Sequence, residues 1–152
     1  MTVHARYVHT NLIAQNWKKL ARFYEQVFGC TPVPPQRALA GRWLEESTGV
    51  SDAEIEGIHL RLPGYDRDGP TLEVFSYNHA QERSSTATNR PGLAHIAFAV
   101  EDVDAAREAV VSAGGGVVGK TVEVEIAGAG TITFVYVTDP EGNVIELQRW
   151  HH

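Results

Sequence analysis

The chain has 152 residues, 43% of them hydrophobic and 21% charged, an ordinary balance for a globular protein with a real core. The formal net charge of −6 at pH 7 argues against a dedicated nucleic-acid binder, which would normally carry a basic patch. No apolar run approaches the roughly 20 residues that cross a membrane, so we expect neither a nucleic-acid nor a membrane partner.

Cysteine usage and the N-terminal sequence indicate the compartment. Cys30 is the single cysteine, so no internal disulfide can form, which fits a reducing cytoplasm. No apolar segment typical of a secretion signal follows Met1, and we therefore expect a cytoplasmic protein. Cys30 follows Gly29 at a predicted helix end and is interpreted as structural. The terminal histidines, His151 and His152, are either native or the remnant of a purification tag, and they are not interpreted as ligands.

An internal repeat divides the chain into two halves. His9 is followed 20 residues later by Gly29, and His95 is followed 20 residues later by Gly115. Each interval contains a segment with apolar residues at helical spacing. The two halves also end alike, because Glu73 and Glu146 each stand four residues after a glycine.

The elements follow in chain order. The first helix is predicted to begin after Asn16, which can cap it, and to end at Gly29. The second is predicted to begin after Asp102 and to end in the glycine run 114–116. Alternating or apolar segments predict strands over residues 5–13, 57–62, 71–77, 93–100, 116–125, 131–138 and 143–149.

Two segments do not follow the repeat. Residues 78–91 are polar and poor in apolar anchors, so we interpret them as a linker between a first module, about 5–77, and a second, about 92–150, of a single domain spanning 1–152. Residues 31–54 are the least regular part, with three prolines at their start. We expect a strand near 42–45 and a mobile loop there.

Strand alternation places the repeated histidines and glutamates on particular faces. Glu73 opposes its apolar neighbours Leu72 and Val74, and Glu146 opposes Ile145 and Leu147. His9 shares a face with Asn11, and His95 shares one with small alanines. Each of the four therefore lies on the face away from the expected helix, and a curved sheet would gather the four faces into a cup.

Four titratable side chains in such a cup would be costly without a balancing charge. A divalent cation removes this cost, and the set His9, Glu73, His95 and Glu146 suits Zn, Ni, Co, Mn or Fe. A strand His beside a Glu is more often a packed or surface pair, but equivalent positions in both halves favour the metal site. The other histidines are weaker candidates, and His59 could line the cup or face water.

The chain resembles the vicinal oxygen chelate superfamily, which includes glyoxalase I, methylmalonyl-CoA epimerase, extradiol dioxygenases, and fosfomycin and bleomycin resistance proteins. The motifs that carry the resemblance are Val8-His9-Thr10-Asn11, Leu20 to Gly29, Leu72-Glu73-Val74-Phe75, Gly92 to Phe98, and Thr138 to Glu146. The resemblance implies an α+β fold with two tandem βαβββ modules forming a cupped mixed sheet around one metal site. It assigns His9 and Glu73 to the first module and His95 and Glu146 to the second, and it implies a homodimer.

The filled Glu73 position favours the glyoxalase I or epimerase branch over the ring-cleaving dioxygenases, which typically lack a ligand there. That branch implies a metal-dependent lyase or isomerase that transfers a proton next to a chelated carbonyl of a small-molecule substrate with vicinal oxygens. We choose Glu146 as the base, with Glu73 second. His9 to Glu73 spans 64 residues, against 51 from His95 to Glu146, and the extra length should shape the pocket.

Three other functions stay open at this point. They are a ring-cleaving dioxygenase, a small-molecule binding or resistance protein without turnover, and a thiol transferase acting on an antibiotic. Arg37, Arg42 and Arg61 are possible anion contacts, although a solvated surface position is the more usual role for each. The sequence names neither the substrate nor the metal.

Overall fold

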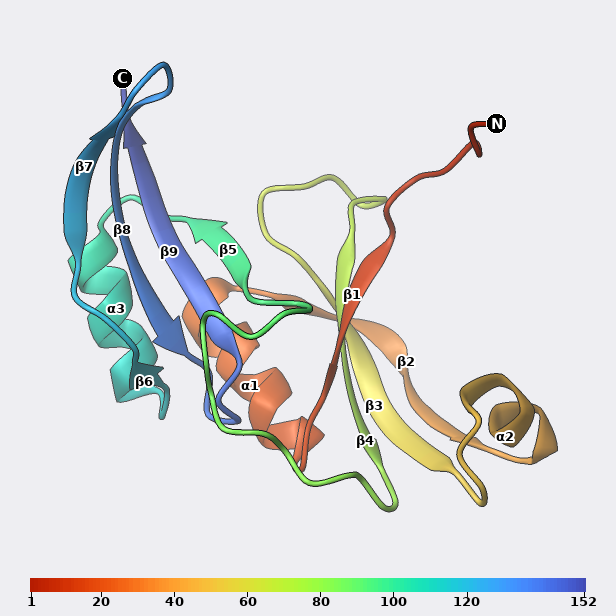
Figure 1. Ribbon diagram of the computed structural model, residues 1–152. Coiled ribbons are helices and arrows are strands. Elements are labelled where there is room, and N and C mark those ends of the chain that lie inside the picture. Colours follow the sequence, from red (N-terminus) through yellow and green to blue (C-terminus); the bar gives the residue numbers. More distant parts are fainter. The chain divides into compact units, whose positions relative to one another are not determined.

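The computed structural model describes residues 1–152, which divide into two compact units, Met1–Glu82 and Arg83–His152. The boundary falls within the segment 78–91 that the sequence predicts as a linker. Each unit begins with a strand and a helix and continues with further strands (Figure 1). The prediction of an α+β fold built from tandem modules is confirmed. No helix is both long enough and apolar enough to cross a membrane.

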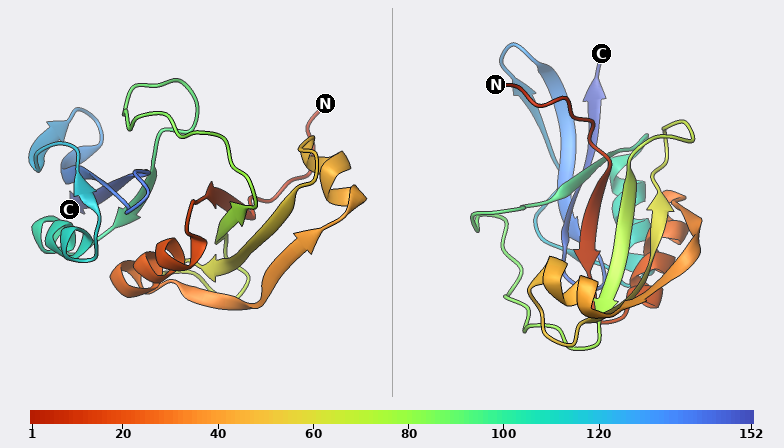
Figure 2. Two further views of the ribbon diagram at one scale, coloured as in Figure 1. Left: turned by 90° about the horizontal axis from the view of Figure 1, so that it is seen from below. Right: turned by 90° about the vertical axis from the view of Figure 1, so that its right-hand side faces the viewer.

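Unit 1 is a four-stranded sheet with two helices. Its elements are β1 His9–Ile13, α1 Trp17–Phe28, β2 Thr31–Ala40, α2 Arg42–Thr48, β3 Glu54–Arg61 and β4 Thr71–Tyr77. The strand order is β1-β4-β3-β2, with β1 parallel to β4 and the other pairs antiparallel. The right-hand view of Figure 2 shows β1, β4 and β3 side by side.

Helix α1 has the ends that its sequence predicts. The Asn16 side chain accepts a hydrogen bond from the Lys19 backbone N–H at 3.1 Å. Gly29 ends the helix in the left-handed region, with φ of 69°. The buried face of α1 consists of Trp17, Leu20, Ala21, Phe23 and Tyr24. It packs against β3 and β4, where the buried Leu60, Leu72 and Val74 share one face of the sheet.

The prediction for residues 31–54 is wrong, because this segment forms β2 and α2. A strand near 42–45 is replaced by the helix Arg42–Thr48, which lies between Gly41 and a C-terminal Gly49 with φ of 72°. The prolines are compatible with β2 because it is an edge strand, where an absent backbone donor costs little. Leu44 of α2 is buried in a cluster with Ala53, Ile55 and Phe75. The expected mobile loop is therefore part of a packed substructure.

Unit 2 repeats the arrangement. Its elements are β5 Ile96–Ala99, α3 Val103–Ser112, β6 Gly116–Val117, β7 Val122–Ile126, β8 Gly130–Thr138 and β9 Val144–His151. The order is β5-β9-β8-β6, with β5 parallel to β9 and β7 also paired to β8. Helix α3 contributes the buried Val103 and Val110 and packs on β8 and β9. The prediction of one continuous strand over residues 116–125 is wrong, because this segment forms two short strands, β6 and β7.

A turn before β9 fixes the start of that strand. Asp139 is buried, and its Oδ1 accepts hydrogen bonds from the backbone N–H groups of Glu141 and Asn143 at 2.9 and 3.0 Å. Its Oδ2 accepts from the Asn143 side-chain amide at 2.8 Å. These contacts replace the water that a buried carboxylate would lose. They hold the strand that carries Glu146.

Candidate functional site

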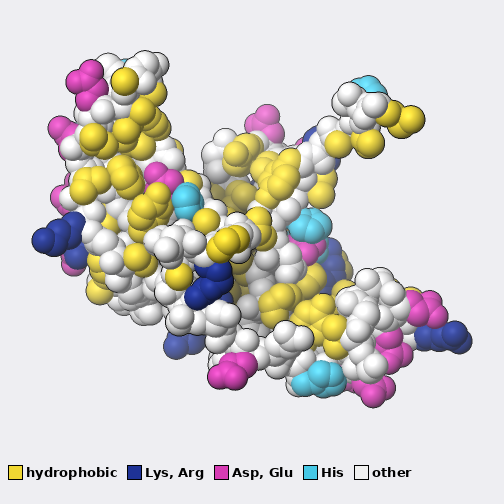
Figure 3. Space-filling model, viewed as in Figure 1, with side chains coloured by type: hydrophobic (Ala, Val, Ile, Leu, Met, Phe, Trp, Pro, Cys, Tyr) yellow, Lys and Arg dark blue, Asp and Glu magenta, His cyan; other side chains and the backbone are white.

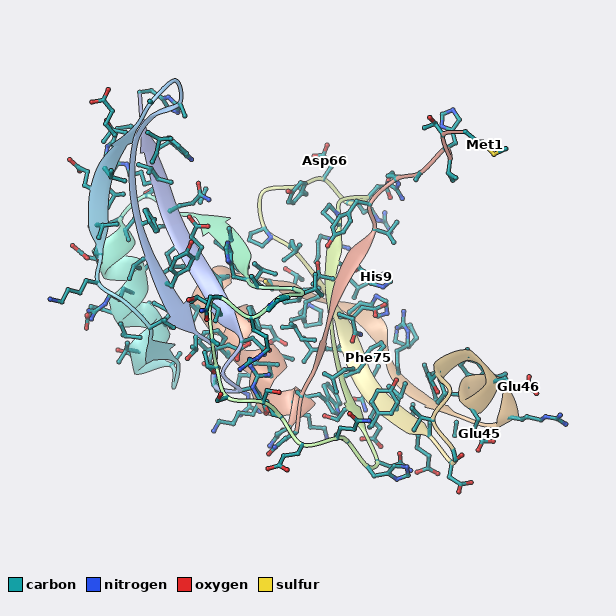
Figure 4. All side chains as sticks on the ribbon, in the orientation of Figure 1. Met1, His9, Glu45, Glu46, Asp66 and Phe75 are labelled. Carbon is teal, nitrogen blue, oxygen red and sulfur yellow. The ribbon has the colours of Figure 1, made fainter.

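Strand register on unit 1 places side chains in rows across the face of the sheet opposite α1 (the open face). Residues that pair across neighbouring strands share a face of the sheet. The strand pairing therefore identifies the residues that lie beside His9, Asn11 and Ile13 on the open face. The three rows are His9, Thr71 and Arg61; Asn11, Glu73, His59 and Val33; and Ile13, Phe75, Gly57 and Arg37. Figure 4 shows His9 and Phe75 on the same side of the sheet.

Glu73 is the centre of the polar part of the open face. Its Oε1 lies 3.5 Å from His9 Nδ1 and 3.1 Å from His59 Nε2. Its Oε2 accepts a hydrogen bond of 2.9 Å from the Asn11 side-chain amide. The Glu73 side chain is only 11% exposed, so these polar contacts offset the desolvation of its carboxylate. His9 and Glu73, which we expect to belong to one site, therefore lie in contact in unit 1.

His59 is a further site residue, for which the sequence leaves open whether it lines the cup or faces water. It stands opposite Glu73 in the antiparallel pair of β3 and β4. Burial lowers the pKa of His59, the Glu73 carboxylate opposes this shift, and Arg37 and His9 add to it. Alternation with Ile58 and Leu60 was the available signal, since it separates His59 from the face that α1 covers.

Beyond Glu73 the open face carries the apolar side chains of Ile13 and Phe75. The Phe75 ring meets the His59 ring in an edge-to-face contact, with 5.7 Å between centroids. Opposite Phe75 stands Gly57, where an added Cβ would overlap the Phe75 ring and the Val74 carbonyl. The glycine therefore lets Phe75 lie against β3, forming an apolar wall beside the polar group.

Unit 2 contains the matching pair. His95 immediately precedes β5, and its Nε2 lies 3.1 Å from Glu146 Oε2 on β9. The neighbouring Ala97 pairs with Glu146 across the parallel strands, and Tyr136 pairs with it on the other side. The His95 ring lies 5.1 Å from the Tyr136 ring. Glu146 is 14% exposed at the side chain, and its buried neighbours Ile145 and Leu147 occupy the opposite face, as alternation predicts.

The two pairs fit the chemistry of a divalent metal. Two ligands about 2.1 Å from one ion are separated by about 3.0 Å at a right angle and about 3.4 Å at the tetrahedral angle. The observed N–O separations of 3.1 Å for His95 with Glu146 and 3.5 Å for His9 with Glu73 are close to these values. Neither unit alone holds three or more His, Cys, Asp or Glu side chains arranged to bind a metal. The meeting of the two pairs at one ion stays a prediction.

The three candidate arginines separate into two groups. Arg42 forms an exposed ion pair of 2.8 Å with Glu46 on α2, which agrees with a solvated surface position. Arg37 and Arg61 instead lie in rows of the open face, and each is half-buried. The Arg61 Nε atom is buried and has no hydrogen-bond partner.

Cys30 lies outside this arrangement. It is 4% exposed and unpaired, and burial raises the pKa of its thiol to about 11, with a further contribution from Glu25. A thiol with this pKa stays protonated at neutral pH. The contacts of Cys30 therefore agree with the structural role that we expect for it.

Comparison with known proteins identifies the family. The family model described as "Glyoxalase/Bleomycin resistance protein/Dioxygenase superfamily" matches residues 6–147. A Vibrio parahaemolyticus protein named "Probable lactoylglutathione lyase" is 27% identical over 144 residues, covering 95% of this chain and 90% of the relative.

Solved structures share the fold. A glyoxalase family protein of Bacillus cereus superposes with a TM-score of 0.83 at 18% identity, covering 99% of this chain and 97% of that one. A genomically encoded fosfomycin resistance protein of Listeria monocytogenes gives a TM-score of 0.59 at 16% identity, covering 99% of this chain and 96% of that one.

Proposed function

The chain belongs to the glyoxalase/bleomycin resistance protein/dioxygenase superfamily, and on that basis we propose that it is a metal-dependent lyase or isomerase of the glyoxalase I or epimerase type. The single observation that carries the proposal is the presence of a close imidazole–carboxylate pair in each of two repeated units. Members of this superfamily typically use a divalent metal.

In this proposal His9, Glu73, His95 and Glu146 together hold one divalent ion, of Zn, Ni, Co, Mn or Fe. The donor set supports this, since two neutral imidazoles and two carboxylates suit a borderline cation and balance its charge. A Glu at the position of Glu73, rather than an apolar side chain, supplies the fourth ligand. A bound ion would polarise a carbonyl of a substrate with vicinal oxygens and make the neighbouring C–H more acidic.

Proton transfer is assigned to Glu146. Glu73 is held by contacts from His9, His59 and Asn11, whereas the polar contact of Glu146 is with His95. A carboxylate with fewer fixed partners is freer to accept a proton from carbon and return it to a neighbouring carbon. Glu73 is the second choice. Phe75 and the rest of the apolar wall would limit water access to the reacting atoms.

The proposal is tested by hydrogen exchange in D₂O. Protein loaded with each candidate metal is incubated with 2-hydroxyketones and acyl thioesters, including lactoylglutathione because of the name of the Vibrio relative. We expect NMR to show deuterium entering the position next to the carbonyl of at least one compound. Exchange should fall at least 100-fold in Glu146→Gln, because the base is lost while the side-chain size is kept.

The absence of deuterium exchange would separate the lyase or isomerase proposal from the two alternative functions. If every substrate class stays unexchanged in metal-loaded protein, the lyase or isomerase proposal is wrong. Tight binding of a compound without turnover would instead identify a small-molecule binding protein. Oxygen uptake with catechols and Fe(II) would identify a ring-cleaving dioxygenase.

We also propose that the protein is a cytoplasmic homodimer. Hydrophobic side chains gather over β7, β8 and β9 (Figure 3), and Val122, Val124 and Ile126 of β7 are each more than 40% exposed. An apolar strand of this kind needs a partner to remove it from water, and a second copy is the simplest one. Light scattering coupled to size-exclusion chromatography should give a molar mass twice the chain mass of 16.7 kDa. A monomer at micromolar concentration would rule the dimer out.

A further inference from the structure

We propose that the two units are joined by a hinge of only three residues, 80–82, and that the rest of the linker is fastened to one unit or the other. The sequence predicts the whole segment 78–91 as a linker because it is polar and poor in apolar anchors. In the structure, polar side chains anchor both ends of this segment instead. A hinge at this place does not depend on a bound metal.

The first end of the linker is anchored to unit 1. The Asn78 backbone N–H donates to the Glu54 carbonyl at 2.9 Å, and the Asn78 side-chain oxygen accepts from the Glu54 backbone N–H at 3.0 Å. The Asn78 side-chain amide also donates to the Asp52 carbonyl at 2.9 Å. In the next residue, His79 Nε2 lies 3.3 Å from the Ser51 carbonyl oxygen. These contacts hold the chain to unit 1 as far as residue 79.

The second end of the linker, residues 83–90 (the strap), is anchored to unit 2. It lies against the turn that precedes β9. Arg83 Nη1 donates to the Asn143 side-chain oxygen at 3.1 Å, and Thr86 Oγ1 donates to the Gly142 carbonyl at 2.8 Å. The strap therefore has two attachment points, three residues apart, on neighbouring residues of one turn.

The turn is a firm support for the strap. The Asn143 side-chain amide donates to Asp139 Oδ2 at 2.8 Å, and Asp139 is buried. At Gly142, where φ is 90°, an added Cβ would lie 2.8 Å from Thr86 Oγ1. The strap thus lies so close to the turn that a side chain at residue 142 would displace it.

The strap is also closed on itself. Arg90 Nη1 donates to the Ser85 carbonyl at 2.7 Å, and Arg90 Nη2 lies 3.4 Å from Ser85 Oγ. Between these two residues, Ala87 is half-buried although the rest of the strap is exposed. Residues 85–90 therefore form a small loop with its ends joined, and they do not form an open connection.

The residues between the two anchors are Ala80, Gln81 and Glu82. All three are exposed, and they take part in none of the hydrogen bonds or ion pairs of the structure. The boundary between the two compact units falls directly after Glu82. Backbone of this kind can change its dihedral angles without losing a contact, which is what a hinge residue must do. Three extended residues span only about 10 Å, so the hinge changes the direction of the chain more than its reach.

Backbone ¹⁵N relaxation of the full chain tests the hinge directly. The order parameter of an N–H bond is about 0.85 in rigid backbone and below about 0.6 in flexible backbone. We expect rigid values at Asn78 and through the strap, and flexible values at residues 80–82. Flexible values through the whole strap would overturn the proposal, and so would rigid values at residues 80–82.

A double variant tests the anchors of the strap. Arg83→Gln with Thr86→Val removes both donors to the turn, and residues 83–88 should then fall into the flexible range, below about 0.6. Ser84→Ala with Asn89→Ala is the matched control, because both side chains are exposed in the strap and outside these contacts. Order parameters of the strap that stay at the wild-type values in the first variant would show that these contacts do not hold it.

Insertions make the same distinction without removing any side chain. Two glycines inserted after Gln81 lengthen the hinge and should leave the amide chemical shifts of Gly142 and Asn143 unchanged. Two glycines inserted after Ser84 fall between the attachment points of the strap and should displace both resonances. Equal displacement by the two insertions, or displacement by neither, would contradict a strap that begins at residue 83.

Discussion

Asn11 on β1 and Glu73 on β4 stand opposite each other in a parallel strand pair, joined by a 2.9 Å hydrogen bond from the Asn11 amide to Glu73 Oε2. This contact fixes the carboxylate at the point where it also meets His9 and His59. Partners of metal ligands commonly determine how well the ligands are aligned. Asn11 is therefore a positioning residue for Glu73.

Replacing Asn11 with Ala should weaken metal binding about 10- to 100-fold, because Glu73 would lose the donor that orients it. The measurement is a competition titration of Zn²⁺ against a chromophoric chelator. Asn11→Gln should recover part of the affinity, which a general loss of folding would not allow. Asn89→Ala, an exposed change in the linker, is the control and should match wild type. Unchanged affinity in Asn11→Ala would show that Asn11 does not position the ligand.

Gly57→Ala should destabilise the protein by about 1–3 kcal/mol, the usual cost of forcing extra volume into a packed site. The added Cβ would meet the Phe75 ring and the backbone of β4, and neither can move freely. Urea unfolding followed by circular dichroism measures the change. Gly119→Ala is the matched control, because a Cβ there meets nothing within 4 Å. Equal stabilities of the two variants would contradict the tight contact of Phe75 with β3.

Cys30 should make stability depend on pH in the alkaline range. Its folded-state pKa is raised from 9.0 to about 11, so the unfolded chain loses the thiol proton first as pH rises. The stability of wild type should therefore be intact below pH 9 and should decrease between pH 9 and 11. Cys30→Ala should lack this contribution, and unfolding midpoints of both proteins at pH 8 and 10.5 provide the comparison. An identical pH dependence would mean that the thiolate is not penalised by burial.

Alternation and capping were sufficient to predict much of this structure. Asn16 and Gly29 mark the ends of α1 as the local chemistry requires, and the side of the strand that carries Glu73 or Glu146 follows from the apolar residues next to it. These signals are local, so they can be read from a few neighbouring residues.

Features that depend on register could not be predicted in the same way. Alternation gives the face of His59 but not its cross-strand partner, and the pairing with Glu73 is set by how β3 aligns with β4. The same alignment places Arg61 on the open face, and the pairing of β2 with β3, which contains a register shift after Val33, places Arg37 opposite Gly57. The helix α2 was missed because Trp43 and Leu44 are a short apolar run, and its packing on Ile55 and Phe75 is a tertiary contact.

The most direct test is metal stoichiometry, measured on protein from which His151 and His152 have been removed. If the two imidazole–carboxylate pairs share one ion, wild type should bind one divalent ion per chain, and His9→Ala and His95→Ala should each lower its affinity at least 100-fold. Two ions per chain with independent sensitivity to these changes would contradict a shared site, as would full stoichiometry and affinity in His95→Ala.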